Sequence, residues 1–81
     1  MKEQDIIDLK FERFDVGIEE SGYEAYHYYE YDIGDVSFIT NSNDELTEGE
    51  WHVELFDMDS IRFKSIEDLK LFIEILKRNK L

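Results

Sequence analysis

The stretch from Glu50 to Leu81 constrains the fold more than any other part of the sequence, because it ends in a well-delimited amphipathic helix. Ser65 is a good N-cap, since its hydroxyl can accept a hydrogen bond from a free N–H group of the first helical turn. Asp68 follows three residues later, and no Gly or Pro interrupts the chain from there to its end. At about 100° per residue, one face collects the apolar residues Ile66, Leu69, Phe72, Ile73 and Leu76. We therefore predict a helix over Ser65–Asn79 that packs on the core through this face.

Two strands are predicted before this helix. Apolar side chains recur at every second position, with Trp51, Val53 and Leu55 on one side of the chain and His52, Glu54 and Phe56 on the other. This is the period of a strand with one buried face. A turn is predicted over Asp57–Ser60, and a short returning strand over Ile61–Phe63. The residues that we expect to be buried together are Trp51, Val53, Leu55, Phe63, Leu69, Phe72, Ile73 and Leu76.

The N-terminal half has a weaker pattern. Residues 2–9 fit either a short helix or the beginning of a strand; we favour a helix to about Asp8, followed by a strand to about Val16. A loop is predicted over residues 17–22, which contain two glycines. Further strands are predicted over residues 23–33 and 36–40, joined by Gly34 and Asp35, and an acidic loop is predicted over residues 41–49.

The predicted fold class is α+β: an antiparallel sheet of four to five strands (a meander), packed against the C-terminal helix, with a short N-terminal helix. Every connection is short enough for neighbouring antiparallel strands, and none could hold a helical crossover. We expect one domain over residues 1–81. The C-terminal helix should cover one sheet face, the N-terminal helix should cover a sheet edge, and the other face should stay partly solvated.

Charge is distributed very unevenly along the chain. The formal net charge is −12, yet residues 14–61 hold fourteen acidic residues and no Lys or Arg. Such a block cannot neutralise its own carboxylates and must expose a negative field. Direct binding to nucleic acid is excluded for this block, because phosphate contacts need Lys and Arg.

Composition sets a few further limits. The chain has no cysteine, so it has neither a disulfide nor a thiolate metal site. An apolar content of 42% argues against disorder. No signal peptide or membrane-spanning segment is recognisable, and we expect a soluble cytoplasmic protein that does not bind membranes.

All five tyrosines fall between Tyr23 and Tyr31. On a strand, Tyr23, Ala25, His27, Tyr29, Tyr31 and Ile33 share one face, and Glu24, Tyr26, Tyr28, Glu30 and Asp32 share the other. The second set carries charge at both ends and is predicted to face outward. Cross-strand aromatic packing is one interpretation of its tyrosines. The other is a binding surface, because Tyr is enriched at interface hot spots.

No motif for catalysis or metal binding is found, and we expect neither an enzyme nor a cofactor. His27 and His52 have no ligand spacing around them and are interpreted as rings satisfied by a nearby carboxylate. The segment that begins at Asn41 has some features of a calcium loop, but Leu46 stands at the sixth position, where the loop needs glycine, and His52 at the twelfth, where it needs glutamate.

Two functions remain open. In size and charge the chain resembles small acidic proteins of phages and mobile elements, a class that includes inhibitors offering carboxylates in place of nucleic-acid phosphates. This resemblance implies a protein-binding module for a basic, nucleic-acid-binding partner. The candidate partner-binding residues are Glu24, Tyr26, Tyr28, Glu30, Asp32, Asp44, Glu45 and Glu48. The alternative is an assembly protein, a monomer or weak homodimer that self-associates through Leu71 and Ile75, beside the apolar face of the C-terminal helix.

Overall fold

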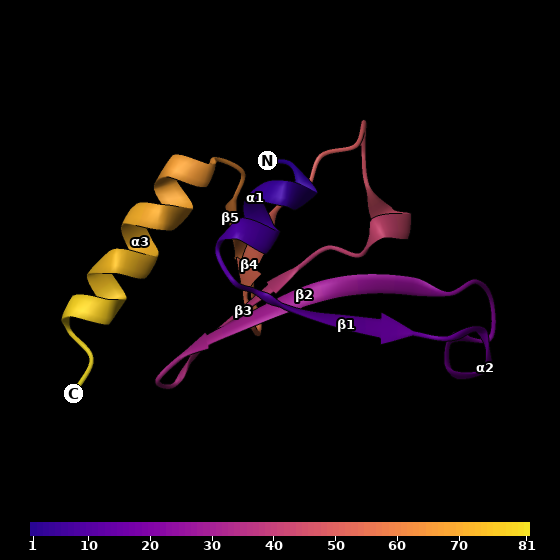
Figure 1. Ribbon diagram of the computed structural model, residues 1–81, viewed down its shortest axis with the longest axis horizontal. Helices are drawn as coiled ribbons and strands as arrows, with labels where there is room; N and C mark the ends of the chain where they lie inside the picture. The colour runs from indigo at the N-terminus through magenta and orange to yellow at the C-terminus, as the bar shows by residue number, and fades with distance from the viewer.

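The computed structural model describes residues 1–81 as a five-stranded sheet with the N- and C-terminal helices packed on one face (Figure 1). In chain order the elements are α1 (Glu3–Asp8), β1 (Glu12–Val16), α2 (Ile18–Ser21), β2 (Tyr26–Ile33), β3 (Val36–Thr40), the 3-10 turn η1 (Asn43–Glu45), β4 (Val53–Leu55), β5 (Met58–Phe63) and α3 (Ile66–Arg78). The strands lie in the order β1-β2-β3-β4-β5, and every neighbouring pair is antiparallel. The predicted α+β meander is confirmed.

The C-terminal helix has the predicted ends and the predicted face. The Ser65 hydroxyl accepts a hydrogen bond from the N–H group of Asp68 at 3.3 Å. Leu69 and Ile73 are buried against the sheet, while the other apolar side chains of this face are half-buried beside them. Burial of this face, more than helix propensity, holds a helix of this length on the sheet.

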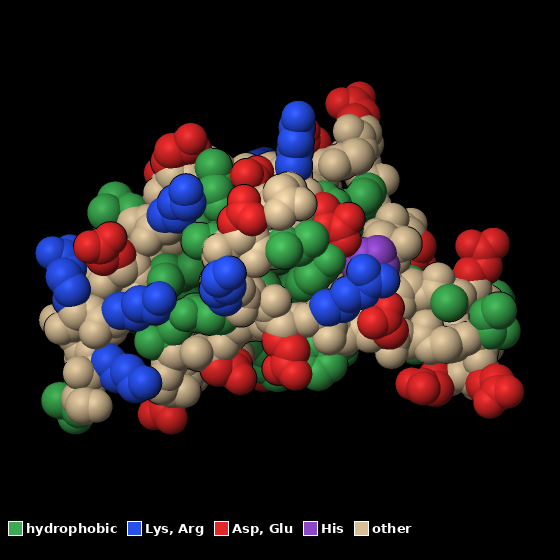
Figure 2. All heavy atoms as spheres, in the orientation of Figure 1, with side chains coloured by type: hydrophobic (Ala, Val, Ile, Leu, Met, Phe, Trp, Pro, Cys, Tyr) green, Lys and Arg blue, Asp and Glu red, His purple; other side chains and the backbone are tan.

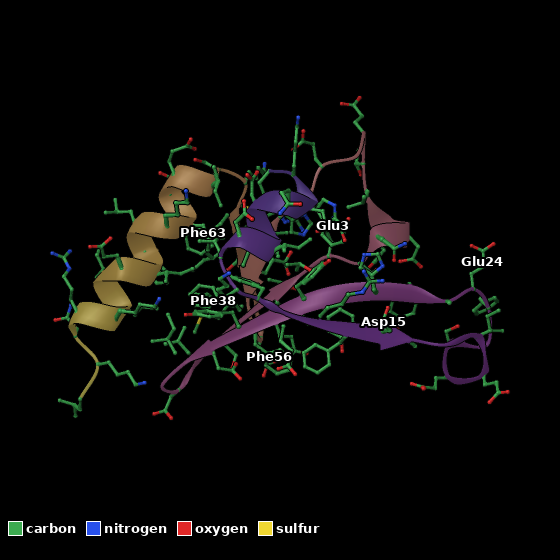
Figure 3. The ribbon with its side chains drawn as sticks, viewed as in Figure 1. Glu3, Asp15, Glu24, Phe38, Phe56 and Phe63 are labelled. Carbon is green, nitrogen blue, oxygen red and sulfur yellow. The ribbon has the colours of Figure 1, made fainter.

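One hydrophobic core lies between the helices and the sheet. Of the eight residues predicted to be buried together, Trp51, Val53, Leu69 and Ile73 are buried, and Leu55, Phe63, Phe72 and Leu76 pack half-buried around them. The centre is Phe38, which is fully buried and lies 6.0 Å from the ring of Phe72 and 6.4 Å from that of Phe63 (Figure 3). The remaining buried apolar residues are Ile6, Phe11, Tyr29 and Ile33, all from the N-terminal half.

The N-terminal helix is confirmed, but its predicted place at a sheet edge is wrong. α1 lies over the same sheet face as α3 (Figure 1), and its Ile6 is fully buried in the core. The N-terminal ammonium group fixes this position, because it donates to the carbonyl oxygens of Trp51 and Lys64, at 3.2 Å each. A large apolar side chain such as Ile6 becomes fully buried only where core residues surround it. The covered sheet face provides such neighbours, and a sheet edge does not.

Three predicted boundaries are also wrong. The loop over residues 17–22 contains the single helical turn α2, which Gly22 ends in the left-handed conformation with φ 80°. β2 begins at Tyr26 and leaves Tyr23 outside the sheet. β5 begins at Met58, within the stretch predicted as a turn, because Asp57 takes the left-handed conformation (φ 63°) and reverses the chain earlier.

The sheet face that points away from α1 and α3 carries no helix (Figure 1), as predicted. None of the helices has the length and the apolar character that crossing a membrane would require.

Candidate partner-binding surface

The uncovered sheet face, here called the open face, carries a stripe of aromatic and aliphatic side chains. The register places Phe14 opposite Tyr28 and Val16 opposite Tyr26. The rings of Phe14 and Tyr28 are stacked with their centroids 5.6 Å apart, and Tyr26 lies 6.5 Å from Tyr28. Phe56, which is 57% exposed, lies on this side of the sheet (Figure 3). Both interpretations of the outward tyrosines thus retain support, since the rings pack across strands and also form part of an accessible surface.

Carboxylates border this stripe. Glu12 lies directly opposite Glu30 across β1 and β2, and Asp32 follows on the same face. Like charges opposite one another destabilise a sheet, so the arrangement costs stability and concentrates negative charge. Burial and the neighbouring Glu30 carboxylate raise the pKa of the Tyr28 hydroxyl, which therefore stays neutral and can donate a hydrogen bond at physiological pH.

A second feature lies beyond the start of β2, where residues of α2 and η1 line one hollow. The hollow is lined by Glu20, Ser21, Tyr23, Glu24, Tyr26 and Asp44; we call this set the acidic tip. It holds three carboxylates, two tyrosines and no basic side chain. Figure 3 shows Glu24 at this end of the molecule, pointing away from the sheet.

Local hydrogen bonds hold the acidic tip in place. The Ser21 hydroxyl donates to the carbonyl oxygen of Glu24 at 2.9 Å and accepts from the N–H group of Tyr23 at 3.1 Å. On the other side, the N–H group of His27 donates to Asn43 Oδ1 at 2.7 Å, which fastens η1 to the start of β2. The buried Ser42 hydroxyl lies 2.5 Å from Asp44 Oδ1 and 2.6 Å from Glu45 Oε1, so both carboxylates of η1 lie beside this donor.

The structure divides the predicted site residues into three groups. Glu24, Tyr26 and Asp44 come together at the acidic tip, while Tyr28, Glu30 and Asp32 lie along the open face of β2. Glu45 and Glu48 join neither group. Glu45 faces a separate cavity of about 190 Å³ with a mixture of charges, lined by Asn41, Glu45, Thr47, Glu50, Trp51, His52, Arg62 and Lys64.

Three residues of the acidic tip, Glu20, Ser21 and Tyr23, were not predicted as site residues from the sequence. Tyr23 was assigned to the buried face of a strand, but it lies outside the sheet and is 86% exposed. Glu20 was assigned to a loop, whereas α2 presents it beside Tyr23. The available signal was Gly22: a glycine in the left-handed conformation ends a helical turn and redirects the chain before the strand can begin.

A polar cluster on the covered face fastens α1 to the sheet. Glu3 Oε2 lies 2.6 Å from His27 Nε2 and accepts a hydrogen bond from the Tyr29 hydroxyl at 2.7 Å. The bonds from Tyr29 and then His27 lower the pKa of Glu3, despite the opposing effect of burial. Burial and the bond to Glu3 raise the pKa of Tyr29. The prediction that each histidine meets a carboxylate is confirmed, since His52 Nε2 also lies 3.3 Å from Glu54 Oε1.

Few carboxylates of residues 14–61 have a cationic partner from Lys, Arg or the N-terminus. Asp15 pairs with Arg13 at 3.0 Å, Glu50 with the N-terminal ammonium group at 2.9 Å, and Glu54 with Arg62 at 2.8 Å. All three cations come from outside the block. Figure 2 shows most of the Lys and Arg side chains around α3, whereas the charged side chains at the far end, around α2, are all acidic. The negative field that the sequence predicts is therefore strongest at the acidic tip.

These features describe a surface able to bind a cation-bearing partner through carboxylates and aromatic rings. No three His, Asp or Glu side chains come together in an arrangement that could hold a metal ion. The exposed flank of α3 is a separate apolar feature, with Leu71 59% and Ile75 39% exposed. The sequence matches no protein-family model, and no curated protein or solved structure is significantly similar to it.

Proposed function

We propose that the protein is a binding module for a basic protein, which it contacts through the acidic tip and the adjoining open face. The observation that carries the proposal is the composition of the tip: Glu20, Glu24 and Asp44 surround a hollow that also contains Tyr23 and Tyr26. A Lys or Arg side chain entering it would meet carboxylates for ion pairing and tyrosine rings for cation–π contact. Tyr23 supplies exposed aromatic area of the kind that anchors interfaces.

The class of partner that we propose is a nucleic-acid-binding protein. Duplex DNA offers one negative charge per about 1.7 Å of axis, whereas same-face residues of one strand recur only about every 6.6 Å. A competitor must therefore use several elements. In this protein the carboxylates come from β1, β2, α2, η1 and the segment before β2. They are Glu12, Glu30, Asp32, Glu20, Glu24 and Asp44. The protein would then act as an inhibitor by occupying the phosphate-binding surface of its partner.

Two charge-reversed variants test the proposal. The tip variant carries Glu20→Lys, Glu24→Lys and Asp44→Lys. The control variant carries Asp8→Lys, Asp59→Lys and Glu74→Lys, three exposed positions away from the tip that give the same change in net charge. Each protein is immobilised and used to capture proteins from a lysate at low and at high salt, and the captured proteins are identified by mass spectrometry.

We expect the unmodified protein and the control variant to retain basic proteins at low salt, and the tip variant to lose them. Duplex DNA should release the captured proteins if they are nucleic-acid-binding ones. Equal loss in both variants would mean that net charge alone is responsible, and would contradict binding at the tip. Capture that duplex DNA does not reverse would keep the binding function and remove the proposed partner class.

A second candidate function, self-association as an assembly component, is favoured by the exposed pair Leu71 and Ile75 on α3. The two functions differ in their response to salt. Binding through carboxylates weakens as salt screens the charges, whereas apolar association does not.

A further inference from the structure

The sheet has two edges, and only β1 presents a regular one. At the other edge, the pairing of β4 with β5 shifts register between Glu54 and Leu55, an irregularity of the kind that blocks further strand addition. β1 pairs with β2 without a register shift over its whole length and contains no Pro or Lys. Its edge therefore has neither a bulge nor a proline, and what limits pairing there is the charge of its side chains, which only a partner strand of matching charge can satisfy.

The hydrogen-bonding direction of β1 follows from two contacts of β2. The N–H groups of His27 and Tyr29 donate to Asn43 Oδ1 and Thr40 Oγ1, on the side away from β1. Donors alternate along a strand, so Tyr28 bonds toward β1 and exchanges hydrogen bonds with Phe14, its register partner. Arg13 and Asp15 consequently direct their own N–H and C=O groups out of the sheet, at the free edge.

The side chains of these two residues are also complementary. Arg13 and Asp15 lie on the same face of β1, paired at 3.0 Å, and their side chains are 51% and 67% exposed. Phe14, between them, points to the open face, where it stacks on Tyr28. The edge thus carries a cation at Arg13 and an anion at Asp15, one on each side of Phe14. Each of these two residues also presents a free N–H group and a free C=O group.

We propose that β1 is a dimerisation edge, which pairs antiparallel with β1 of a second copy about a two-fold axis through Phe14. This register places Arg13 opposite Asp15 of the second copy, and Asp15 opposite Arg13 of the second copy. Each pair can exchange two backbone hydrogen bonds and form a cross-strand ion pair. The two Phe14 side chains meet at the axis on the open face, as a non-hydrogen-bonded pair whose side chains lie closest.

No neighbouring two-fold register has this complementarity. An axis through Arg13 would bring two arginines together, and one through Asp15 would bring two aspartates together, which is destabilising. A two-fold axis between residues would oppose side chains from different faces and break the continuous sheet. The charges of β1 are thus complementary to those of β1 in a second copy of this chain, and only in the register centred on Phe14.

The decisive test mixes two variants. Arg13→Asp leaves acids at both edge positions, and Asp15→Arg leaves bases at both, so each alone places like charges opposite one another. When the two variants are mixed in equal amounts, both cross-strand pairs of a mixed dimer join an acid of one chain to a base of the other. Neither variant can form the ion pair within its own chain, so recovery in the mixture would report pairing between chains.

Sedimentation equilibrium up to millimolar protein, at about 0.15 M salt to screen the net charge, measures the association. We expect a weak dimer of the unmodified protein, association weakened about tenfold or more in each variant alone, and recovery in the mixture. Asp15→Pro should also abolish the dimer, because it removes an N–H group that points out of the sheet and leaves the β1–β2 hydrogen bonds intact. Far-UV circular dichroism checks that every variant is folded.

A monomer at every concentration would overturn the proposal, and so would a mixture that associates no better than its components. A dimer that tolerates these changes but is lost in Leu71→Glu would place the interface on α3 instead. Capture of basic proteins by the acidic tip does not depend on any of these outcomes, because neither Arg13 nor Asp15 belongs to the tip.

Discussion

At the scale of single residues, Glu3 shows how one charged side chain can serve the fold in a protein whose carboxylates are mostly unpaired. Its Oε2 atom accepts a hydrogen bond from the Tyr29 hydroxyl and lies 2.6 Å from the His27 ring, which ties α1 to β2. Most other acids of the chain have no such partner. Glu3 is therefore a stabilising residue, in contrast to the acids of the tip.

Glu3→Gln is expected to destabilise the fold by about 1–2 kcal/mol at neutral pH, because the ionised acceptor of two hydrogen bonds is lost. The pKa of Glu3 is lowered in the folded protein. The stabilisation that ionised Glu3 gives the fold is thus complete above its unfolded-state pKa of about 4.3. It disappears as the pH falls through the lower pKa of the folded state. Denaturant unfolding at pH 7 and pH 3 measures both effects. The exposed Glu74→Gln serves as the control, and an equal cost of Glu3→Gln at both pH values would contradict this role.

At the scale of elements, α3 has two apolar surfaces with different neighbours. One carries Leu69 and Ile73 and is buried against the sheet, and the other carries Leu71 and Ile75 and faces solvent. The first surface is explained by the fold. The second has no covering element in the monomer.

Leu71→Glu tests whether the exposed flank of α3 causes self-association. If it does, light scattering at several protein concentrations should show an unmodified protein that associates in a salt-tolerant way, and a variant that stays monomeric. The substitution should change the free energy of unfolding by no more than about 0.5 kcal/mol, because Leu71 is a surface position. Lys70→Glu, next to it on the exposed side, is the matched control. Association unaffected by Leu71→Glu would exclude this flank.

At the scale of the whole molecule, charge is separated along the long axis. The bases gather around α3, and the far end around α2 and η1 is acidic (Figure 2). Fold stability and the proposed partner binding make opposite demands on the acidic end, since clustered carboxylates repel one another but would attract a basic partner.

Moderate salt should therefore stabilise the protein. Raising the ionic strength from low to about 0.15 M shortens the Debye length to about 8 Å, which screens the unpaired carboxylates from one another and should raise the thermal midpoint. Glu12→Lys should raise the midpoint at low salt by itself, because it places a base opposite Glu30, and it should reduce the response to salt. Thermal unfolding followed by circular dichroism measures both. A midpoint that is flat between low and moderate salt would show that repulsion is not significant.

Patterns local in the sequence predicted much of this architecture. Alternation along residues 51–55 predicted a buried strand face, and Ser65 with its apolar periodicity predicted α3, because strand alternation and helix capping depend only on neighbouring residues. The outward position of Tyr26 and Tyr28 followed from the same alternation. The absence of bases between residues 14 and 61 predicted a negative surface without any knowledge of the fold.

Tertiary structure decided which distant residues meet. α1 lies on the covered face, with Ile6 buried, because Glu3 bonds to β2 and the N-terminal ammonium group bonds to the backbone before β4 and after β5. No local sequence pattern encodes these contacts. Asp44 joins Glu24 at the acidic tip because Asn43 bonds to the backbone of His27. The adjacent Glu45, whose Oε1 atom lies 2.6 Å from the Ser42 hydroxyl, lines a separate cavity instead. The sequence by itself thus determined the five strands in their order, the N- and C-terminal helices and the sign of the surface charge, but not the turn α2 or the starts of β2 and β5. The arrangement of the carboxylates into a site was decided by long-range hydrogen bonds, which form only when the chain is folded.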